Sequence, residues 1–377
     1  MKKVTILALH LGAGGIERIT TMLANNLCNN YNVEIVSTYK LFNKPFFELD
    51  KRVKVKYLIP NLKPNKKEFK EALNDFRFIK AFKEGMKSLK ILKLRKSTMI
   101  EYIKNSDSDV IISTRDIFNE WLGKYGSKYI KKIGWEHNHH NDDKKYVKKI
   151  VKSVKNLDYF VLVSKELCAY YQDKVKPKCL YIPNCLDFYP DELSKLDKNH
   201  ILSVGRLSPE KDPIELLEVF KIVHNKFPDW KLDVVGSGVL EDKMEDKIEE
   251  LGLTDSVIMH GYRNRDYINA LLKDTSIFVT TSKTESFGIV VLEAFAYGVP
   301  CVAYSSAQGI KEIVSNNYDA YLVNERNREV MAKRIMELIK NKNRRVIMGD
   351  YAFKTALKYK DSNICKIWID LIEKNAK

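Results

Sequence analysis

The stretch that decides the fold spans residues 277–303 and reads IFVTTSKTESFGIVVLEAFAYGVPCVA. It opens with a short apolar run ending at Thr280, passes through a polar loop, and continues after Gly288 as the helical run IVVLEAFAYG. A second short apolar run follows from Pro300. Short β-branched runs that alternate with longer amphipathic ones indicate parallel strands covered by helices. We therefore predict a strand, a helix and a parallel strand here.

The same alternation occurs in two successive regions, and we predict one domain for each. The chain has 377 residues, more than one ordinary hydrophobic core holds. Residues 186–200 are polar and lack either periodicity, so we place the hinge there. The predicted fold class is α/β, with two Rossmann-like, doubly wound parallel-sheet domains, residues 1–188 and 189–357, facing across a cleft. We expect a C-terminal helix, about 358–377, to pack back on the first domain.

The predicted elements place the loops in which we look for functional residues. In doubly wound sheets, ligands bind beyond the carboxyl ends of the strands. Helices are expected at 16–29, 213–226, 240–251, 288–297 and 327–341, among others. Strands are expected at 4–9, 33–38, 53–58, 109–113, 129–136, 159–163, 180–183, 201–204, 232–235, 257–259, 277–280, 300–303 and 320–323.

The positive charge of the chain is concentrated in its first half. Residues 1–190 carry 37 Lys and Arg against 20 Asp and Glu, whereas the remainder carries 28 against 29. This asymmetry predicts that one half faces an anionic partner while the other binds something smaller. The six cysteines show no C-x-x-C spacing, as expected in a reducing cytosol. No segment approaches the roughly 18 consecutive apolar residues of a membrane helix.

Two cations follow the first strand of the second half, in the stretch VGRLSPEKDP at 204–213. Arg206 and Lys211 lie in a loop before a helix that Pro213 is expected to start. They can bind a diphosphate; the alternative is that they are two solvated surface charges. Gly236, in the VGSG turn after the next strand, permits a tight turn or a close approach of the backbone to a ligand.

Two carboxylates flank the start of the helix in the opening stretch. Gly288 lies at or beside the helix N-terminus, whose unpaired amides and dipole favour phosphate. Glu285 in the loop and Glu293 within the first two turns repel phosphate, but they can accept hydrogen bonds from sugar hydroxyls beside it. The alternative is a helix-terminal charge and a surface residue without a ligand.

Together these motifs resemble the nucleotide-sugar domain of the retaining glycosyltransferases of family 4, which have the GT-B fold. The resemblance rests on VGRLxxxK, VGSG, HG at 260–261, E-x7-E with FG inside it, and AYGVPCVA, and it covers nearly the whole chain. It implies that Arg206 and Lys211 bind the donor diphosphate. It implies that Glu285 contacts the transferred sugar and Glu293 the ribose. The implied donor-binding positions also include Gly236, Gly261, Phe287, Gly288 and Ile289, with backbone amides completing the phosphate site.

The first half carries matching motifs. The stretch LGAGGIER at 11–18 resembles a glycine-rich entry of the family, in which Gly14 and Gly15 let the backbone approach donor and acceptor. A nicotinamide-binding fingerprint is excluded, because it requires Gly or Ala where Glu17 stands. The stretch WEHN at 135–138 matches the family's cleft histidine. The resemblance thus makes His137 a catalytic residue that contacts the donor sugar, beside Glu285 and the two cations. The alternative is a loop histidine with no role in binding or catalysis.

Three further patterns have competing interpretations. His137, His139 and His140 could form a metal site, but the only additional ligands nearby in sequence are Asp142 and Asp143, and we predict no metal. DSD at 107–109 resembles the metal-binding motif of another glycosyltransferase fold, and we interpret it as a helix-to-strand turn. IPNCLD at 182–187 resembles the hinge of the family with Cys185 in place of glycine, which leaves the turn geometry open.

Residues 66–96 are predicted to form a basic amphipathic helix. Apolar residues from Phe69 to Leu92 recur there at steps of three and four, with lysines between them. Such a helix can lie on an anionic lipid surface or pack its apolar stripe on its own domain, and both can hold.

We therefore expect an enzyme, a metal-independent retaining glycosyltransferase without a cofactor. The resemblance implies transfer of a hexose or N-acetylhexosamine from a UDP-sugar to a lipid-linked glycan acceptor in bacterial cell-surface polysaccharide synthesis. Expected partners are the UDP-sugar, the acceptor and an anionic membrane, with a cytoplasmic protein attached peripherally to its inner face. The alternative is a nucleotide-sugar epimerase or phosphorylase on the same fold. A nucleic-acid-binding protein would account for the basic half but leaves E-x7-E unexplained, so we expect no nucleic acid.

Overall fold

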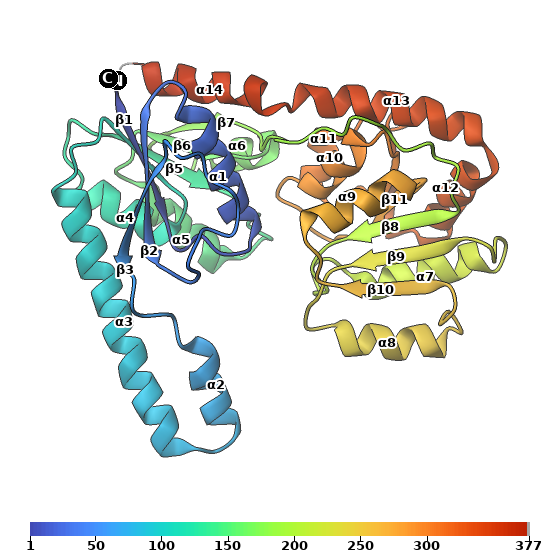
Figure 1. The fold of residues 1–377 in the computed structure, drawn as a ribbon, viewed down its shortest axis with the longest axis horizontal. Helices are drawn as coiled ribbons and strands as arrows, with labels where there is room; N and C mark the ends of the chain where they lie inside the picture. Colours follow the sequence, from blue (N-terminus) through green and yellow to red (C-terminus); the bar gives the residue numbers. More distant parts are fainter. Residues whose placement is uncertain (375–377) are drawn as a thin grey trace. The chain divides into compact units, whose positions relative to one another are not determined.

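The structure, a computed structural model, describes residues 1–374, apart from the side chains of residues 66 and 67. It divides into two compact units: residues 1–182 with the segment from Ile364 onward, and residues 183–363. Each unit has one parallel sheet with helices packed around it (Figure 1). This confirms the predicted α/β class with two Rossmann-like units. The last residues of the predicted C-terminal helix, 375–377, lie outside the described part.

The sheet of the first unit has the strand order β3-β2-β1-β4-β5-β6-β7, and neighbouring strands run parallel. The order reverses between β1 and β4, so the loops after these two strands flank the point where such sheets bind ligands. The strands are β1 (Lys3–Ala8), β2 (Asn32–Tyr39), β3 (Lys54–Ile59), β4 (Val110–Ser113), β5 (Lys131–Glu136), β6 (Tyr159–Leu162) and β7 (Lys178–Tyr181). The helices are α1 (Gly15–Leu27), α2 (Lys66–Asn74), α3 (Phe78–Lys104), α4 (Asp116–Tyr125), α5 (Lys144–Val154), α6 (Lys165–Gln172) and most of α14 (Asp361–Glu373).

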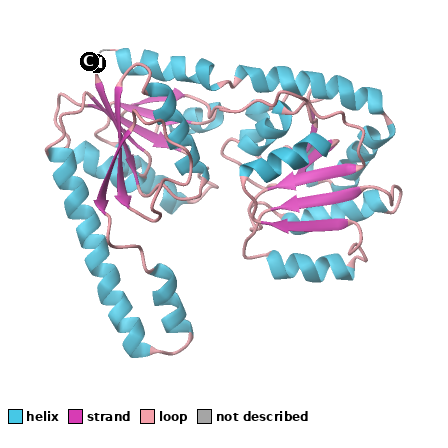
Figure 2. Ribbon diagram, viewed as in Figure 1, coloured by secondary structure: helices cyan, strands magenta, loops and turns pink. Residues whose placement is uncertain are grey.

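The sheet of the second unit has the order β10-β9-β8-β11-β12-β13, again parallel, and reverses between β8 and β11. Figure 2 distinguishes its strands from the helices around them. The strands are β8 (His200–Val204), β9 (Lys231–Val235), β10 (Val257–Gly261), β11 (Ile277–Thr280), β12 (Cys301–Tyr304) and β13 (Ala320–Val323). The helices are α7 (Pro213–His224), α8 (Glu241–Glu250), α9 (Arg265–Asp274), α10 (Ile289–Ala296), α11 (Gln308–Ile313), a 3-10 turn η1 (Asn324–Arg326), α12 (Arg328–Lys340) and α13 (Lys342–Lys358).

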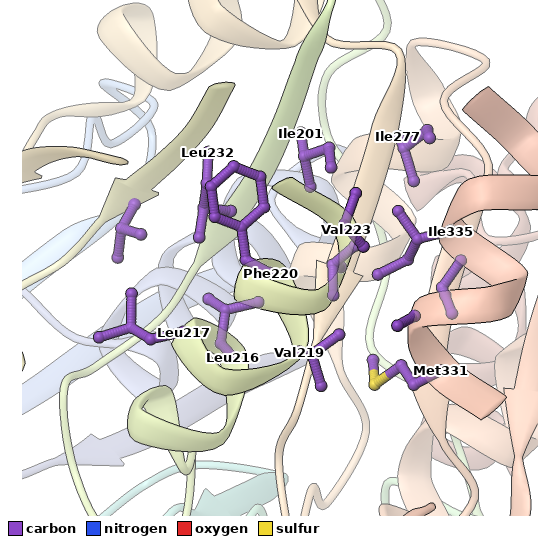
Figure 3. Close-up of a cluster of buried hydrophobic side chains, with 14 of the residues drawn as sticks. Ile201, Leu216, Leu217, Val219, Phe220, Val223, Leu232, Ile277, Met331 and Ile335 are labelled. Carbon is purple, nitrogen blue, oxygen red and sulfur yellow. The ribbon is translucent and has the colours of Figure 1, made fainter. Parts of the chain in front are cut away.

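The core of the second unit explains why α7 forms where the sequence predicts it. Pro213 occupies the first helical position, where its missing N–H costs nothing. The apolar face of the helix then packs Phe220 and Val223 toward the sheet residues Ile201 and Leu232 (Figure 3). These residues belong to a larger cluster of buried hydrophobic side chains, which also includes Ile277 of β11. The cluster holds β8 and β11 in place, and with them the loops that follow these strands.

Helix α14 belongs with the first unit because of two contacts with β5. The buried Trp368 ring lies edge-on to Trp135, with the centroids 4.9 Å apart. Lys131 Nζ donates to the carbonyl oxygens of Leu371 and Ile372, at 2.9 and 2.8 Å. A cation at a helix C-terminus satisfies carbonyls that lack an intrahelical partner.

The predicted single helix at 66–96 is wrong. The chain forms two helices, α2 and α3, and between them Phe76 takes a left-handed backbone conformation with φ 55°. Figure 1 shows α3 extending past the end of the sheet with α2 lying alongside its first half. Asn74 and Asp75, which favour turns over helix interiors, account for the break.

This helical pair, which we call the α2–α3 hairpin, leaves large apolar side chains exposed near its turn. Phe76, Phe78, Ile79 and Phe82 are each 68–77% exposed. A groove of about 560 Å³, lined by Phe69, Leu73 and Met86 among others, runs between the two helices. Within residues 1–374, none of the helices combines the length and the apolarity that a membrane crossing requires.

Candidate active site

The predicted site residues divide between the units. Arg206 and Lys211 lie in the loop between β8 and α7, at the reversal of the second sheet. The Arg206 side chain is 73% exposed, with Nη1 3.6 Å from Glu210 Oε1. Lys211 is more buried, and its ammonium forms a short ion pair with Glu285. The structure thus brings Lys211 and Glu285 together although they are far apart in the sequence.

The glycine turns after β8, β9 and β10 lie side by side. A Cβ on Gly236, which has φ 147°, would lie 1.8 Å from the carbonyl oxygen of Gly205. The Gly236 amide donates to the Gly261 carbonyl at 2.9 Å, and Gly261 itself has φ 66°. The turn at Gly236 therefore requires glycine so that the loop carrying Arg206 can approach it.

The loop before α10 presents an open helix N-terminus. Gly288 is the N-cap residue with φ 90° and makes no side-chain cap hydrogen bond, so the amides of Ile289 and Val290 keep their donor capacity, whereas the Val291 amide donates to the Gly288 carbonyl at 2.9 Å. Phe287 is 3% exposed and anchors the loop in the core. Gly309 is a residue that the sequence analysis missed: its amide donates to the Glu285 carbonyl at 2.9 Å, and a Cβ there would lie 2.4 Å from the Phe287 nitrogen.

The two carboxylates have different surroundings. Glu285 is 11% exposed and accepts hydrogen bonds from Lys211 and, at 3.1 Å, from Ser282 Oγ. Glu293 lies half-buried in α10, where it acts electrostatically on the Tyr297 hydroxyl. Burial is the main reason that the pKa of Tyr297 is raised to about 12, and the charge of Glu293 contributes. Glu285 is therefore tied by an ion pair to the loop that carries Arg206 and Lys211, whereas Glu293 acts within its own helix.

Arg326, in η1, also organises these loops and was not predicted. Its Nη2 donates to Asp212 Oδ2 at 2.7 Å, and its Nη1 to the Thr281 carbonyl at 3.0 Å. The guanidinium lies over the Tyr304 ring, 4.5 Å from the centroid. Arg326 thus joins the loop after β8 to the loop after β11. Its position after the end of β13 places it at the ligand-binding edge of the sheet, but the sequence does not show which loops it contacts.

Gly14 and Gly15 begin α1 at the reversal of the first sheet. A Cβ on Gly14 would lie 2.1 Å from the Glu17 carboxylate, which folds back over it. Glu17 is 6% exposed and accepts a hydrogen bond from Arg115 Nη2 at 2.8 Å. The Gly14 position therefore serves the Glu17–Arg115 pair, whereas a Cβ on Gly15 would meet no atom within 4 Å.

His137 directly follows β5, and its ring lies 4.3 Å from that of Trp135. Burial, helped by the charge of Arg115, lowers the pKa of His137 to about 3, so the imidazole is neutral near pH 7. Its Nε2 is buried and has no hydrogen-bond partner in the described part of the chain. Such an atom can bond to a ligand. The adjacent Glu136 carboxylate accepts from the amides of His137 and Asn138 at 2.9 and 2.8 Å and so fixes the loop.

The aspartates of the DSD motif and of the histidine loop have structural roles. Asp107 and Asp109 form the turn before β4, where they bind the Lys3 ammonium at 2.5 Å and the Lys3 amide at 2.7 Å. Asp143 caps α5 by accepting from Lys145 N at 2.8 Å. The fold adds a candidate ligand from a distant part of the sequence, because α6 places Glu166 beside the imidazoles of His139 and His140.

The arrangement in the second unit suits a substrate that combines negative charge with hydroxyl groups. Arg206, Lys211 and the α10 amides supply positive charge and donors at one edge of the sheet. Glu285 and Glu293 supply acceptors that suit hydroxyls. A nucleoside diphosphate linked to a sugar has both kinds of group.

Comparison with known proteins agrees with this chemistry. Residues 187–355 match the family model described as "Glycosyl transferases group 1". An uncharacterized glycosyltransferase of Haemophilus influenzae is 30% identical over 374 residues, 97% of this chain and 98% of that protein. A Campylobacter jejuni enzyme named as an α-1,4-N-acetyl-D-galactosaminyltransferase acting on a GalNAc-containing, diphosphate-linked undecaprenol is 26% identical over 384 residues, 99% of this chain and 98% of that protein.

Solved structures share the fold. A TarM mutant of S. aureus, in complex with fondaparinux, α-GlcNAc-glycerol and UDP, has a TM-score of 0.79 at 16% identity, covering 99% of this chain and 100% of that one. The lipopolysaccharide outer core galactosyltransferase WaaB has a TM-score of 0.72 at 18% identity, covering 98% and 99%. At this identity the likeness speaks for the fold alone, which is GT-B. The family model and the relative at 30% identity together show that the chain belongs to the group 1 glycosyltransferases.

Proposed function

We propose that this glycosyltransferase is a family 4 enzyme that moves a hexose or N-acetylhexosamine from a UDP-sugar to a lipid-linked glycan acceptor in cell-surface polysaccharide synthesis. We propose further that it retains the anomeric configuration and needs no metal. The observation that carries this proposal is the Lys211–Glu285 ion pair, which lies between the cationic loop after β8 and the uncapped N-terminus of α10. The loop that we propose binds phosphate and the carboxylate that we propose binds the sugar are there in contact.

The metal-free mechanism follows from the charge that develops on the departing diphosphate. Arg206, Lys211 and the amides that start α10 can stabilise that charge without a cation, since preorganised donors act strongly where water is excluded. If the acceptor attacks from the face of the leaving group, the diphosphate itself can take the acceptor proton. Glu285 then orients the sugar. A double displacement with Glu285 as the nucleophile is the competing mechanism.

His137 contributes as a neutral hydrogen-bonding group. Its lowered pKa keeps the imidazole uncharged across the physiological range, and its Nε2 is without a partner among the described residues. A neutral imidazole can donate or accept one hydrogen bond at that atom, depending on the tautomer. We therefore assign His137 to a hydroxyl of the donor sugar and do not assign it the role of an acid.

Support for the donor and the acceptor comes from relatives. Structural neighbours include HepE bound to UDP and glucose, with a TM-score of 0.76. The Campylobacter relative is named for a lipid-diphosphate acceptor. A further relative, from Bacillus subtilis, is a poly(glycerol-phosphate) α-glucosyltransferase. A cytoplasmic enzyme held at the inner face of an anionic membrane, through its basic first unit, would meet acceptors of this kind.

The test is a transfer assay with purified protein, a panel of UDP-sugars and lipid-linked glycans extracted from membranes. One UDP-sugar should be consumed only when acceptor is added, the new linkage should keep the donor's anomeric configuration by NMR, and EDTA should leave the rate unchanged. Epimer or sugar phosphate formed from donor alone would show the alternative activity. Inversion of configuration, or loss of rate in EDTA restored by Mg²⁺, would contradict the proposed mechanism.

A further inference from the structure

Two histidines and a glutamate converge beyond the carboxyl ends of β5 and β6, outside the groups assigned to the donor. His139 and His140 lie in the loop after β5, and Glu166 lies in the first turn of α6. The distances from His139 Nε2 to Glu166 Oε2 and from His140 Nε2 to Glu166 Oε1 are both 3.4 Å. One ligand atom from each residue can be chosen so that all three lie within 4.8 Å of one another.

These contacts are too long to be strong hydrogen bonds. Charge-assisted hydrogen bonds between nitrogen and a carboxylate are about 2.7–2.9 Å long. His139 Nε2 and Glu166 Oε2 are buried and have no hydrogen-bond partner within residues 1–374. Buried polar atoms left unpaired are rare in folded proteins, and a bound ion can satisfy them. The cluster is therefore not accounted for by hydrogen bonding alone.

The separations match those in a zinc site. Around a tetrahedral zinc ion with bonds of about 2.0–2.2 Å, neighbouring ligand atoms lie about 3.4 Å apart. Two imidazoles and one carboxylate are a ligand set that zinc accepts, with a fourth position left for water. His139 lies at this distance from Oε2 of Glu166 and His140 from Oε1, so the carboxylate binds the ion through both oxygens or turns to present one of them. The remaining separation, between the two imidazole nitrogens, has to shorten when an ion binds if it lies near the 4.8 Å limit.

The surrounding residues hold the ligands in place. His140 is 5% exposed, and the Tyr170 ring stacks on it with the centroids 3.8 Å apart and the planes 14° from parallel. Ser164 Oγ accepts the Leu167 amide at 3.2 Å and thereby fixes the first turn of α6, which carries Glu166. Ligands that are preorganised in this way lose little freedom on binding an ion.

The position of the proton on each imidazole decides which ring nitrogen can bind an ion. The amides of Asn141 and Asp142 point at the Nδ1 atoms of His139 and His140, at 2.9 and 3.0 Å, which favours a proton on each Nε2. An ion bound at Nε2 requires the proton on Nδ1 instead. Acceptors for that proton are present: Asn141 Oδ1 lies 3.0 Å from Nδ1 of His139, and Asp142 Oδ1 lies 3.4 Å from Nδ1 of His140. Such acceptors commonly orient metal-bound histidines.

We propose that His139, His140 and Glu166 bind a zinc-type divalent ion. On binding through Nε2, each imidazole carries its proton on Nδ1, so the Asn141 and Asp142 amides that donate to Nδ1 have to turn away from it. The ion joins the loop after β5 to α6. The proposed transfer mechanism uses Arg206, Lys211 and the α10 amides to neutralise the donor diphosphate, and it does not use this ion.

The experiment is a calorimetric zinc titration of the full chain after dialysis against EDTA and then buffer. Wild type should bind one equivalent. Glu166→Gln and His140→Ala should each weaken binding by more than the 10–100-fold that loss of an outer-shell partner typically costs, that is, by about 100-fold or more. His224→Gln, on α7, and Cys168→Ser, on α6, are the matched controls for other nitrogen and sulfur ligands and should bind as wild type does.

Absence of zinc binding by wild type, or equal binding by Glu166→Gln and wild type, overturns the proposal and leaves the residues as a hydrogen-bonded group. Circular dichroism of each variant distinguishes lost ligation from lost folding, and Glu166→Gln keeps the side-chain shape. UDP affinity is measured in metal-free buffer in parallel. It depends on the second unit, so failure of the zinc titration and failure of the transferase proposal are separate results.

Discussion

At the scale of single residues, the two residues predicted to bind phosphate, Arg206 and Lys211, differ in their ion pairs. Arg206 is largely exposed and only 3.6 Å from Glu210, a distance and exposure at which an ion pair contributes little. Lys211 is held in a short pair with Glu285. A diphosphate thus gains Arg206 almost without competition, but must share Lys211 with a carboxylate. Both contributions can be measured separately.

Replacing either cation should slow transfer strongly. Arg206→Ala and Lys211→Ala each remove positive charge facing the leaving diphosphate, which typically costs about 2–4 kcal/mol of transition-state stabilisation. We expect weaker UDP binding by calorimetry and a matching fall in kcat/KM. Lys226→Ala, an exposed lysine after α7, is the control. If Arg206→Ala and Lys211→Ala both bind UDP with wild-type affinity, neither residue belongs to the donor site.

The two carboxylates should affect different parts of the donor. Glu293→Ala should weaken UDP itself, because Glu293 is assigned to the ribose. Glu285→Gln should leave UDP affinity no weaker, since it releases Lys211 from its ion pair, while turnover falls. Binding of UDP and single-turnover rates for both variants make this comparison. The opposite pattern would mean that the two roles are exchanged.

The lowered pKa of His137 should make the protein less stable in acid. An unfolded histidine has a pKa of about 6.5, whereas burial lowers that of folded His137 to about 3. Between these values the unfolded chain binds a proton that the folded chain does not, so the unfolding free energy falls as pH falls, by at most about 1.4 kcal/mol per pH unit. His137→Gln should reduce this slope in urea unfolding between pH 7 and 5.

His200→Gln is the control, because His200 should change the pH dependence of the unfolding free energy in the opposite direction to His137. The hydrogen bond to Asp233, 2.6 Å long, is the main reason that the pKa of His200 is raised. Its contribution to stability is fully present below pH about 6.5 and is lost as pH rises through the raised pKa. Removing it should therefore change the slope only between pH about 6.5 and the raised pKa, where stability then falls more steeply as pH falls, and should leave the slope below that range unchanged. Parallel slopes for wild type and His137→Gln would show that His137 titrates normally in the folded protein.

At the scale of helices and strands, the features that depend on the local sequence pattern could be predicted from the sequence. Every predicted strand overlaps an observed one, because short apolar runs and turn residues mark buried parallel strands. The residues after β8 and β11 could be chosen as site candidates because ligands bind beyond strand ends. The start of α10 could also be predicted from the local sequence. Gly288 has a φ of 90°, a backbone conformation that is unfavourable for a residue with a side chain.

Contacts between distant segments could not be predicted in the same way. Arg326, Gly309 and Glu166 act on loops that are far from them in sequence, and no periodicity reports such pairs. The break at Phe76 was missed because the apolar spacing of three and four continues across it. Gly236 was predicted for a turn or a ligand, and the structure assigns its space to the Gly205 carbonyl. At Cys185, the described backbone needs no left-handed φ, so glycine is not required there.

At the scale of the whole molecule, the charge asymmetry and the α2–α3 hairpin belong to the same half of the chain. Exposed apolar side chains cluster at the turn of the hairpin, and Lys80, Lys83, Lys87 and Lys90 are exposed on α3. A protein surface of this composition commonly binds a membrane or another protein. The lysines favour an anionic membrane, because each contributes about 1 kcal/mol near such a surface.

The last prediction tests this membrane contact. Changing Lys80, Lys83, Lys87 and Lys90 together to Glu should abolish sedimentation with anionic liposomes, and wild-type binding should fall with salt because the attraction is screened over about 8 Å at physiological ionic strength. UDP affinity should survive, since its assigned residues lie in the second unit. The matched control changes Lys226, Lys243, Lys333 and Lys342 to Glu, which alters the net charge equally but on the second unit, and should sediment as wild type does. If both fourfold variants lose binding alike, net charge alone drives it; if wild type does not sediment at physiological salt, the apolar turn of the hairpin serves a protein partner instead.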